Sequence, residues 1–288
     1  MVFLHLKSND METELRELQL KCLEILDIVD KICRKNNIQY SLCGGSVVGA
    51  HLYKGFLPWD DDIDIMLTRD NYNKLVKILP QNLPSGFTFQ DYHTGDVTCN
   101  MGISLGKVYN ENTTLVENTG DVNGIFMDVV PYDKIPENPF LKSIDLFLYK
   151  RSMTINQGKL PGNSLKNRIR SFLLDTVFSN KRLYFRFFQY VVELLGKTSN
   201  YTYRELFGAY YFCNMIPFRP SVFENYTEIE FEGKNYMIVR DYIEYLQTRY
   251  NRTDFREPQE KQVPHHYEYV NFDLPYREFL KQQKKIAL

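Results

Sequence analysis

The segment at residues 58–67 reads Pro-Trp-Asp-Asp-Asp-Ile-Asp-Ile-Met-Leu, which concentrates four aspartates beside and within an apolar run. We expect a buried strand over residues 63–67, in which Asp62 and Asp64 point to one face and the intervening apolar residues to the other. From a rise of ~3.3 Å per residue, the two residues lie about 7 Å apart at Cα. Carboxylates held this close raise each other's pKa unless a cation neutralises them, so the pattern indicates a divalent metal site.

The residues upstream add a feature that suits phosphate binding. A short strand is expected over residues 38–43, and an apolar run of helical type follows over residues 47–52. Gly44, Gly45 and Ser46 stand between them. A glycine-rich turn before a helix offers bare backbone N–H groups and the positive helix terminus to a phosphate.

The residues downstream contain a further acid. Residues 124–131 predict another apolar strand with a single carboxylate inside it, Asp128, which is a candidate third ligand. The alternative interpretation of the acidic segment is a turn that caps a helix over residues 69–79. Both flanks favour the metal site, while Asp60 and Asp61 suit either a ligand role or a turn and capping role.

These residues carry a resemblance to known proteins. Gly-Ser before a helix, Asp-apolar-Asp on a strand and a lone Asp on a later strand resemble the nucleotidyltransferase superfamily typified by polymerase beta. More narrowly, residues 44–50 and 54–65 resemble the LicD family of phosphocholine transferases, which includes relatives of fukutin and fukutin-related protein. The similarity covers most of residues 15–135 and continues through residues 106–108, 112–117 and 124–133.

Toward the C-terminus the resemblance weakens. Family members usually close with a Tyr-Gly-Asp-Tyr-like segment, a proline and a histidine. This chain instead has Tyr250-Asn251 at the start of that segment, then Pro258, then His265 and His266. The order of tyrosine segment, proline and histidine is kept, but the glycine of the motif is absent. By this resemblance His266 is a candidate contact for a phosphate or the acceptor. The alternative is that His265 and His266 are a surface histidine pair.

The resemblance and the chemistry of the residues together suggest roles for the central site. Asp62, Asp64 and Asp128 would hold one or two Mg²⁺ ions, with Mn²⁺ as a substitute, because oxygen ligands and a phosphate substrate favour these metals. Asp128 is also a candidate general base for an acceptor hydroxyl. Lys107 would add positive charge at the transferring phosphoryl group, unless it is a surface charge at a strand end.

Other residues of the motifs are candidates for binding substrate. Gly44, Gly45 and Ser46 would bind phosphate oxygens at the helix start, and the resemblance adds Glu117. Trp59, the only tryptophan, would stack on a base or cover a choline ammonium by cation–π attraction, with core packing as the alternative.

The resemblance implies transfer of phosphocholine from CDP-choline to a sugar hydroxyl of a teichoic acid, lipopolysaccharide or capsule precursor, with release of CMP. Other CDP-alcohols, such as CDP-ribitol or CDP-glycerol, are alternative donors. A conventional nucleotidyltransferase that uses an NTP, or a non-catalytic glycan-binding protein of the same fold, are alternative functions. The acceptor would be a lipid-linked glycan.

Composition limits the remaining classes. The 288 residues are 43% hydrophobic and 25% charged, as in an ordinary globular protein, and 35 basic residues balance 36 acidic ones, so nucleic acid is not an expected partner. The five cysteines are odd in number and lack Cys-x-x-Cys spacing, so we expect reduced, structural thiols. Residues 1–10 lack the apolar core of a signal peptide, and no run approaches the ~20 apolar residues of a membrane span. A cytoplasmic protein is expected.

The order of elements predicts an α+β fold, a nucleotidyltransferase-like mixed sheet flanked by helices. An amphipathic helix is expected over residues 12–35 and another over residues 69–79, the latter stopped by Pro80 and Pro84. Three further strands are expected over residues 87–90, 101–108 and 125–130.

Three parts of the chain are expected. Residues 1–135 form the catalytic core, residues 136–220 a helical insertion that begins with a helix at 141–155, and residues 221–288 complete the catalytic domain with strands at 226–231 and 236–239. Within the insertion, residues 159–197 hold eight basic and two acidic residues among many aromatics. This composition suits peripheral contact with anionic lipid at the inner face of the cell membrane, or else an aromatic core helix with a solvated basic face.

Overall fold

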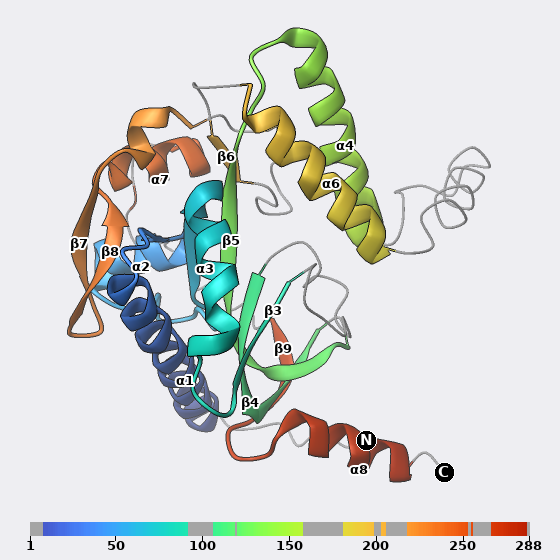
Figure 1. Cartoon of the computed structure of the whole chain (residues 1–288). Helices are drawn as coiled ribbons and strands as arrows, with labels where there is room; N and C mark the ends of the chain where they lie inside the picture. Colours follow the sequence, from blue (N-terminus) through green and yellow to red (C-terminus); the bar gives the residue numbers. More distant parts are fainter. Residues whose placement is uncertain are drawn as a thin grey trace.

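A mixed β-sheet forms the centre of the protein. The computed structural model describes residues 8–91, 106–118, 120–157, 181–198, 203–205, 218–252, 255 and 266–286. Five strands run in the order β1-β2-β5-β4-β3 (Figure 1). Two further strands join this sheet, because β6 pairs with β5 and β9 pairs with β4. Strands β2 and β5 are parallel, and the other pairs are antiparallel. The strands of this sheet are β1 (Ser41–Leu42), β2 (Asp64–Thr68), β3 (Phe87–Gln90), β4 (Gly106–Glu117), β5 (Val122–Lys134), β6 (Tyr203–Glu205) and β9 (Tyr267–Asn271).

Helices and a separate hairpin surround the sheet. The hairpin consists of β7 (Tyr226–Phe231) and β8 (Lys234–Val239). The helices are α1 (Ser8–Lys35), α2 (Gly44–Tyr53), α3 (Arg69–Asn82), α4 (Pro139–Gln157), α6 (Lys181–Gly196), the short 3-10 helix η1 (Pro220–Phe223), α7 (Tyr242–Tyr250) and α8 (Tyr276–Ile286). The predicted α+β class is therefore confirmed.

One apolar core joins the N-terminal helix, the sheet and the C-terminal hairpin. The apolar face of α1, including Cys22 and Ile25, is fully buried together with Ile65 of β2. Ile238 of β8 and Leu246 of α7 belong to the same cluster, although both lie far from α1 and β2 in the sequence. The packing thus brings residues after 220 into the same core as the strand that carries the acidic motif, with β8 against β1 and α7 against α2. The division into parts 1–135, 136–220 and 221–288 stays a prediction.

Helix α1 begins four residues before its predicted start, α4 is two residues longer at each end, and two further helix boundaries differ for a local reason. The glycine-rich triplet is the first turn of α2 rather than a turn before it, because the Ser46 N–H already donates to the Cys43 carbonyl at 3.0 Å. Helix α3 continues past Pro80 to Asn82. A proline removes only one backbone hydrogen bond, and this last turn is held by the Leu83 N–H, which donates to the Leu79 carbonyl at 3.0 Å.

The other expected elements are present where the structure describes them, and β4 runs on to Glu117, well beyond the predicted end. Residues 101–105 and 159–180 lie outside the described residues, as do Cys99 and Cys213. Cys22, Cys33 and Cys43 are buried and free, as predicted. No helix in the described part of the chain is both long and apolar enough to cross a bilayer.

A buried ion pair fastens α3 to the sheet. Arg69 Nε and Nη2 each donate to a carboxylate oxygen of Asp133 on β5 at 2.7 Å, and Nη2 also donates to Gln189 Oε1 of α6 at 2.6 Å. The Asp133 side chain is only 2% exposed. Such two-point pairing fixes the orientation of α3 relative to β5, and the bond to Gln189 adds α6 to the same contact.

Removing this partner should destabilise the fold strongly. We expect Asp133→Ala to lower the free energy of unfolding by about 3 kcal/mol, because the buried Arg69 then loses its two-point carboxylate partner and keeps Glu193, 3.8 Å from its Nη1, as a more distant one. Urea denaturation followed by circular dichroism measures the change. Glu230→Ala removes the exposed Lys54–Glu230 pair instead and should have little effect. Equal stability of the two variants would contradict the structural role of the Arg69–Asp133 pair.

Candidate active site

Three of the predicted residues form a row across adjacent strands. Asp64 of β2 is in register with Asp128 of β5, and Asp128 is in register with Lys107 of β4. Residues that are direct partners on neighbouring strands project from the same face of a sheet. Lys107 Nζ lies 2.9 Å from Asp128 Oδ1, and its side chain is 4% exposed. Lys107 is therefore a buried cation of the site and not a surface charge at a strand end.

The lysine is further held by an aromatic ring. Its Nζ lies 3.4 Å from the ring centroid of Phe126, which precedes Asp128 by two positions on β5. A cation over an aromatic face is attracted by the ring quadrupole. The ammonium is thus fixed between Phe126 and Asp128, where it offsets part of the negative charge.

The acidic residues are crowded enough to alter their ionisation. Burial, Asp62 and Asp128 raise the pKa of Asp64 well above its usual range, and Arg249 partly opposes this rise. Partial burial and the adjacent Asp61 raise the pKa of Asp62 to about 6, against the opposing effect of His266 and Lys107. Burial and the charges of Asp62 and Asp61 also raise the pKa of Asp60. Protein cations alone therefore leave these carboxylates short of positive charge.

This donor set fits a hard divalent cation. All the carboxylates supply oxygen, and a cation would relieve the repulsion that raises their pKa values. Donor atoms of Asp61, Asp62 and His266 all lie within 4.8 Å of one another. The ligand atoms of the predicted trio, Asp62, Asp64 and Asp128, do not all lie within 4.8 Å of one another. Asp64 and Asp128 are instead related by strand register, and both Asp62 and Asp128 raise the pKa of Asp64.

His266 is clamped to Asp61. The His266 backbone N–H donates to Asp61 Oδ2 at 2.6 Å, and its Nδ1 lies 2.7 Å from Asp61 Oδ1. This hydrogen bond raises the pKa of His266 to about 9, although partial burial acts in the opposite direction. The imidazolium also lies 4.0 Å from Asp62 Oδ2, so the residue just before β9 contributes a positive charge to the acidic segment. His265 lies outside the described residues.

Ser46 joins the acidic strand to the start of α2. Its buried hydroxyl accepts the Asp64 N–H at 3.1 Å. A hydroxyl that accepts one hydrogen bond still has its own proton to donate, so this contact is compatible with phosphate binding. The phosphate-binding role itself stays a prediction.

The two glycines before Ser46 leave room for charged side chains. A β-carbon at position 45 would lie 2.7 Å from Asp60 Oδ2, so only glycine lets that carboxylate approach the helix. Gly44 has φ +53°, a conformation that favours glycine, and a β-carbon there would lie 3.4 Å from Arg249 Nη2. The first turn of α2 is therefore flanked by an acid and a guanidinium.

Arg249 is a site residue that the sequence analysis missed. It stands near the end of α7, and its Nη1 donates to the Tyr132 hydroxyl at 3.4 Å. Its charge lowers the pKa of Asp64, which shows that the guanidinium acts on the acidic strand. Its position directly before Tyr250, in the segment compared with the family's closing motif, was the only sequence signal. The Asp61–His266 pairing was missed as well, because nothing in the spacing joins residues 205 apart.

Two further candidates lie around the carboxylates. The Glu117 side chain is buried at the end of β4, accepts a hydrogen bond from Asn123 Nδ2 at 3.3 Å, and has a pKa raised by burial while Lys107 lowers it. The indole of Trp59 is half-buried and meets the ring of Tyr53 edge to face at 6.3 Å between centroids. Trp59 is not among the residues that form the described apolar core, so both its stacking role and the core-packing alternative stay predictions.

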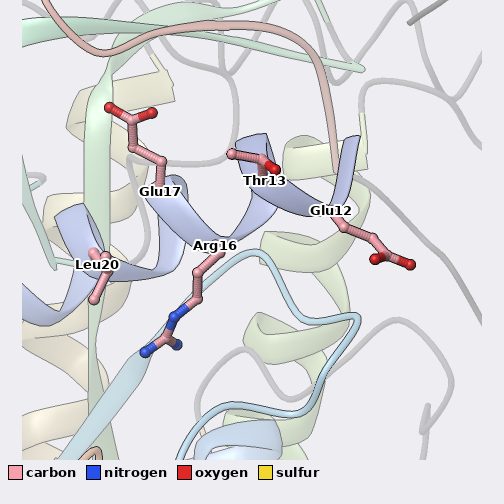
Figure 2. Close-up of a pocket in the computed structure, with 5 residues that line it drawn as sticks. All are labelled: Glu12, Thr13, Arg16, Glu17 and Leu20. Carbon is pink, nitrogen blue, oxygen red and sulfur yellow. The ribbon is translucent and has the colours of Figure 1, made fainter. Parts of the chain in front are cut away.

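A hollow on α1 is separate from these residues. Glu12, Thr13, Arg16, Glu17 and Leu20 line it, and Figure 2 shows that all five side chains come from this one helix. It shares no lining residue with the carboxylate site. We assign no role to it.

Comparisons with known proteins identify relatives. A family profile described as "LicD/FKTN/FKRP, nucleotidyltransferase domain" matches residues 37–160. The "Lipopolysaccharide cholinephosphotransferase LicD" of Haemophilus influenzae is 30% identical over 268 residues, which cover 88% of this chain and 96% of that protein. An uncharacterized protein of Rickettsia prowazekii is 26% identical over 121 residues, 42% of each chain. One from Rickettsia typhi is 31% identical over 68 residues, 24% of this chain and 22% of its own.

The clamp between Asp61 and His266 predicts an unusual titration. In metal-free protein the His266 ring should keep its proton at pH 7 and lose it near pH 9, and Asp61→Asn should lower this pKa because the carboxylate that holds the proton is gone. The pKa is raised by folding, so the stabilisation is complete below about pH 6.5, the unperturbed value. It is lost as the pH rises through 9. Histidine resonances followed by NMR against pH measure both values.

The exposed His51 serves as the reference for that titration. Its resonance should not move in Asp61→Asn. An unchanged His266 pKa in this variant would show that Asp61 does not hold the proton.

Proposed function

Because this chain belongs to the LicD family, we propose that it is a phosphotransferase that moves phosphocholine from CDP-choline to a sugar hydroxyl of a cell-surface glycan and releases CMP. The observation that carries the proposal is the row of Asp64, Asp128 and Lys107 on three adjacent strands, within the residues that match the family. The Haemophilus influenzae relative makes a lipopolysaccharide precursor the first acceptor to test. Teichoic acid and capsule precursors are further acceptors of the same chemistry.

We propose Mg²⁺ as the cofactor, with Mn²⁺ as a substitute, held by Asp62, Asp64 and Asp128. The raised pKa values of Asp62 and Asp64 support this, since they mark carboxylates that need a cation to ionise together. When bound, the ion supplies positive charge to the donor diphosphate.

Asp128 and Lys107 form the part of the site that meets the acceptor. Asp128 is 20% exposed and able to accept a proton from a hydroxyl while Lys107 holds its Oδ1. The buried ammonium pairs with Asp128 and orients it, and it adds positive charge beside the transferring group. Glu117, buried within electrostatic range of Lys107, completes this side of the site.

The start of α2 and Arg249 form the part that meets the donor. The Gly44 and Ser46 N–H groups already donate to the Tyr245 hydroxyl and the Cys43 carbonyl, so the positive terminus of the helix and the adjacent guanidinium are what suit the donor diphosphate. Ser46 donates its hydroxyl proton there, while Asp60 on the other side of Gly45 limits where the phosphate lies. The His266 imidazolium supplies a further positive charge at the acidic segment.

Loss of one strand carboxylate should abolish the reaction. With CDP-choline, Mg²⁺ and a glycan acceptor, we expect Asp64→Ala to reduce CMP release by at least about 100-fold, as for removal of one electrostatic contact to a transition state. Asp70→Ala is the matched control, because Asp70 is an exposed acid in the first turn of α3. Chromatographic detection of CMP measures the reaction, and circular dichroism checks the fold.

The products decide between the alternatives. CMP from CDP-ribitol or CDP-glycerol, but not from CDP-choline, would correct the donor. Pyrophosphate from an NTP would indicate a conventional nucleotidyltransferase. Full activity in Asp64→Ala would contradict the proposed site.

Loss of the Arg249 charge should weaken donor binding. We expect Arg249→Met to raise the KM for CDP-choline by about tenfold, which corresponds to the loss of a hydrogen bond to a charged group. Arg252→Met is the matched control, because Arg252 is exposed and lies over the ring of Phe255. Steady-state kinetics with donor varied at fixed acceptor measure the change. An unchanged KM in a folded Arg249→Met variant would remove Arg249 from the donor site.

A further inference from the structure

Helix α6 is apolar on two opposite faces. Its inner face holds Phe188 and Val192, which are fully buried. On the other side, Phe187, Tyr190 and Leu194 are 54%, 66% and 50% exposed. Their spacing of three and four residues places them along one line of the helix. We call these three residues the outer stripe.

Contacts of the inner face fix the direction in which the outer stripe points. Gln189 accepts a hydrogen bond from Arg69 of α3, and Glu193 accepts one from Asn73 of the same helix at 3.3 Å. Rotation of α6 to bury the outer stripe would break both. The inner face alone therefore holds α6 in place, and the outer stripe serves no purpose in the packing that the structure describes.

The outer stripe lies on a projecting part of the molecule. Figure 1 shows α4 and α6 side by side and antiparallel, standing out from the end of the sheet where β5 leads into α4. Phe140, at the start of α4, is 72% exposed. Large apolar side chains gathered on a projecting surface mark an interaction site more often than scattered single ones do.

The charge around the outer stripe is positive. Arg186 and Lys197 of α6 and the adjoining turn are exposed, as is Lys142 of α4. The one acid of α6, Glu193, is bound to α3 instead. The surface therefore combines apolar side chains with a basic surround, the combination that binds an anionic bilayer surface.

We propose that the outer stripe of α6 is a docking surface for an anionic lipid bilayer. The three side chains enter the headgroup region, and the neighbouring lysines and arginines pair with lipid phosphates. Docking would hold the protein at the surface where a lipid-linked acceptor lies. The proposal does not depend on the transferase reaction, because the surface is defined by exposed side chains and charge alone.

Vesicle binding of the full chain, without donor or acceptor, tests the proposal. We expect the wild type to sediment with vesicles of phosphatidylglycerol and phosphatidylcholine, and to do so less at high salt or with phosphatidylcholine alone. Phe187→Ser combined with Tyr190→Ser should lower the partition coefficient at least tenfold. Leu20→Ser is the matched control, because Leu20 is 49% exposed on α1, and it should bind as the wild type does.

A second variant separates charge from apolar contact. Arg186→Glu should weaken binding to anionic vesicles while it leaves the outer stripe intact. Thermal unfolding of each variant confirms that the fold persists. Unchanged vesicle binding in the folded double variant, or no binding of the wild type, would overturn the proposal. A dimer in sedimentation velocity that the double variant disrupts, with no change in vesicle binding, would assign the surface to a second copy of the chain instead.

Discussion

Repulsion among carboxylates at the start of β2 and on the neighbouring strand β5 is the constraint on which the rest of the site depends. Burial and the charge of Asp128 raise the pKa values of both Asp62 and Asp64, and Asp62 also raises that of Asp64, so the fold has to bring positive charge to them. Lys107 comes from β4, His266 from the segment before β9 and Arg249 from α7. These three cations lie far apart in sequence, and the convergence of their elements on the acidic strands is what the tertiary structure achieves.

The same constraint explains the backbone around the site. Gly44 and Gly45 leave space for Arg249 and Asp60, and the Ser46 hydroxyl ties the acidic strand to the helix start by accepting the Asp64 N–H. The acidic segment, the start of α2 and Arg249 of α7 are therefore held next to one another. A substitution of His266 will change the pKa of the neighbouring carboxylates, because His266 is in direct contact with Asp61 and its charge lowers the pKa of Asp62.

The sequence predicted the helices and strands better than it predicted the contacts between them. Alternating aspartates and isoleucines predicted β2, and Asp128 of β5 stood out because the residues on either side of it are apolar. The register of Asp64 with Asp128, and of Asp128 with Lys107, required strand pairing over tens of residues, which no local pattern states. Arg249 was missed because its relevance arises only when α7 packs against α2. The apolar outer face of α6 was hidden in an aromatic-rich sequence that suits a buried helix equally well.

Binding of Mn²⁺ to the purified protein tests the central claim, that these carboxylates are held together for a cation. Electron paramagnetic resonance reports free Mn²⁺ during a titration of the wild type and of Asp64→Asn. The account predicts that the wild type binds Mn²⁺, more tightly as the pH rises past the pKa of Asp62 at about 6, and that folded Asp64→Asn loses this binding. Equal binding by both proteins, or none by the wild type, would contradict it.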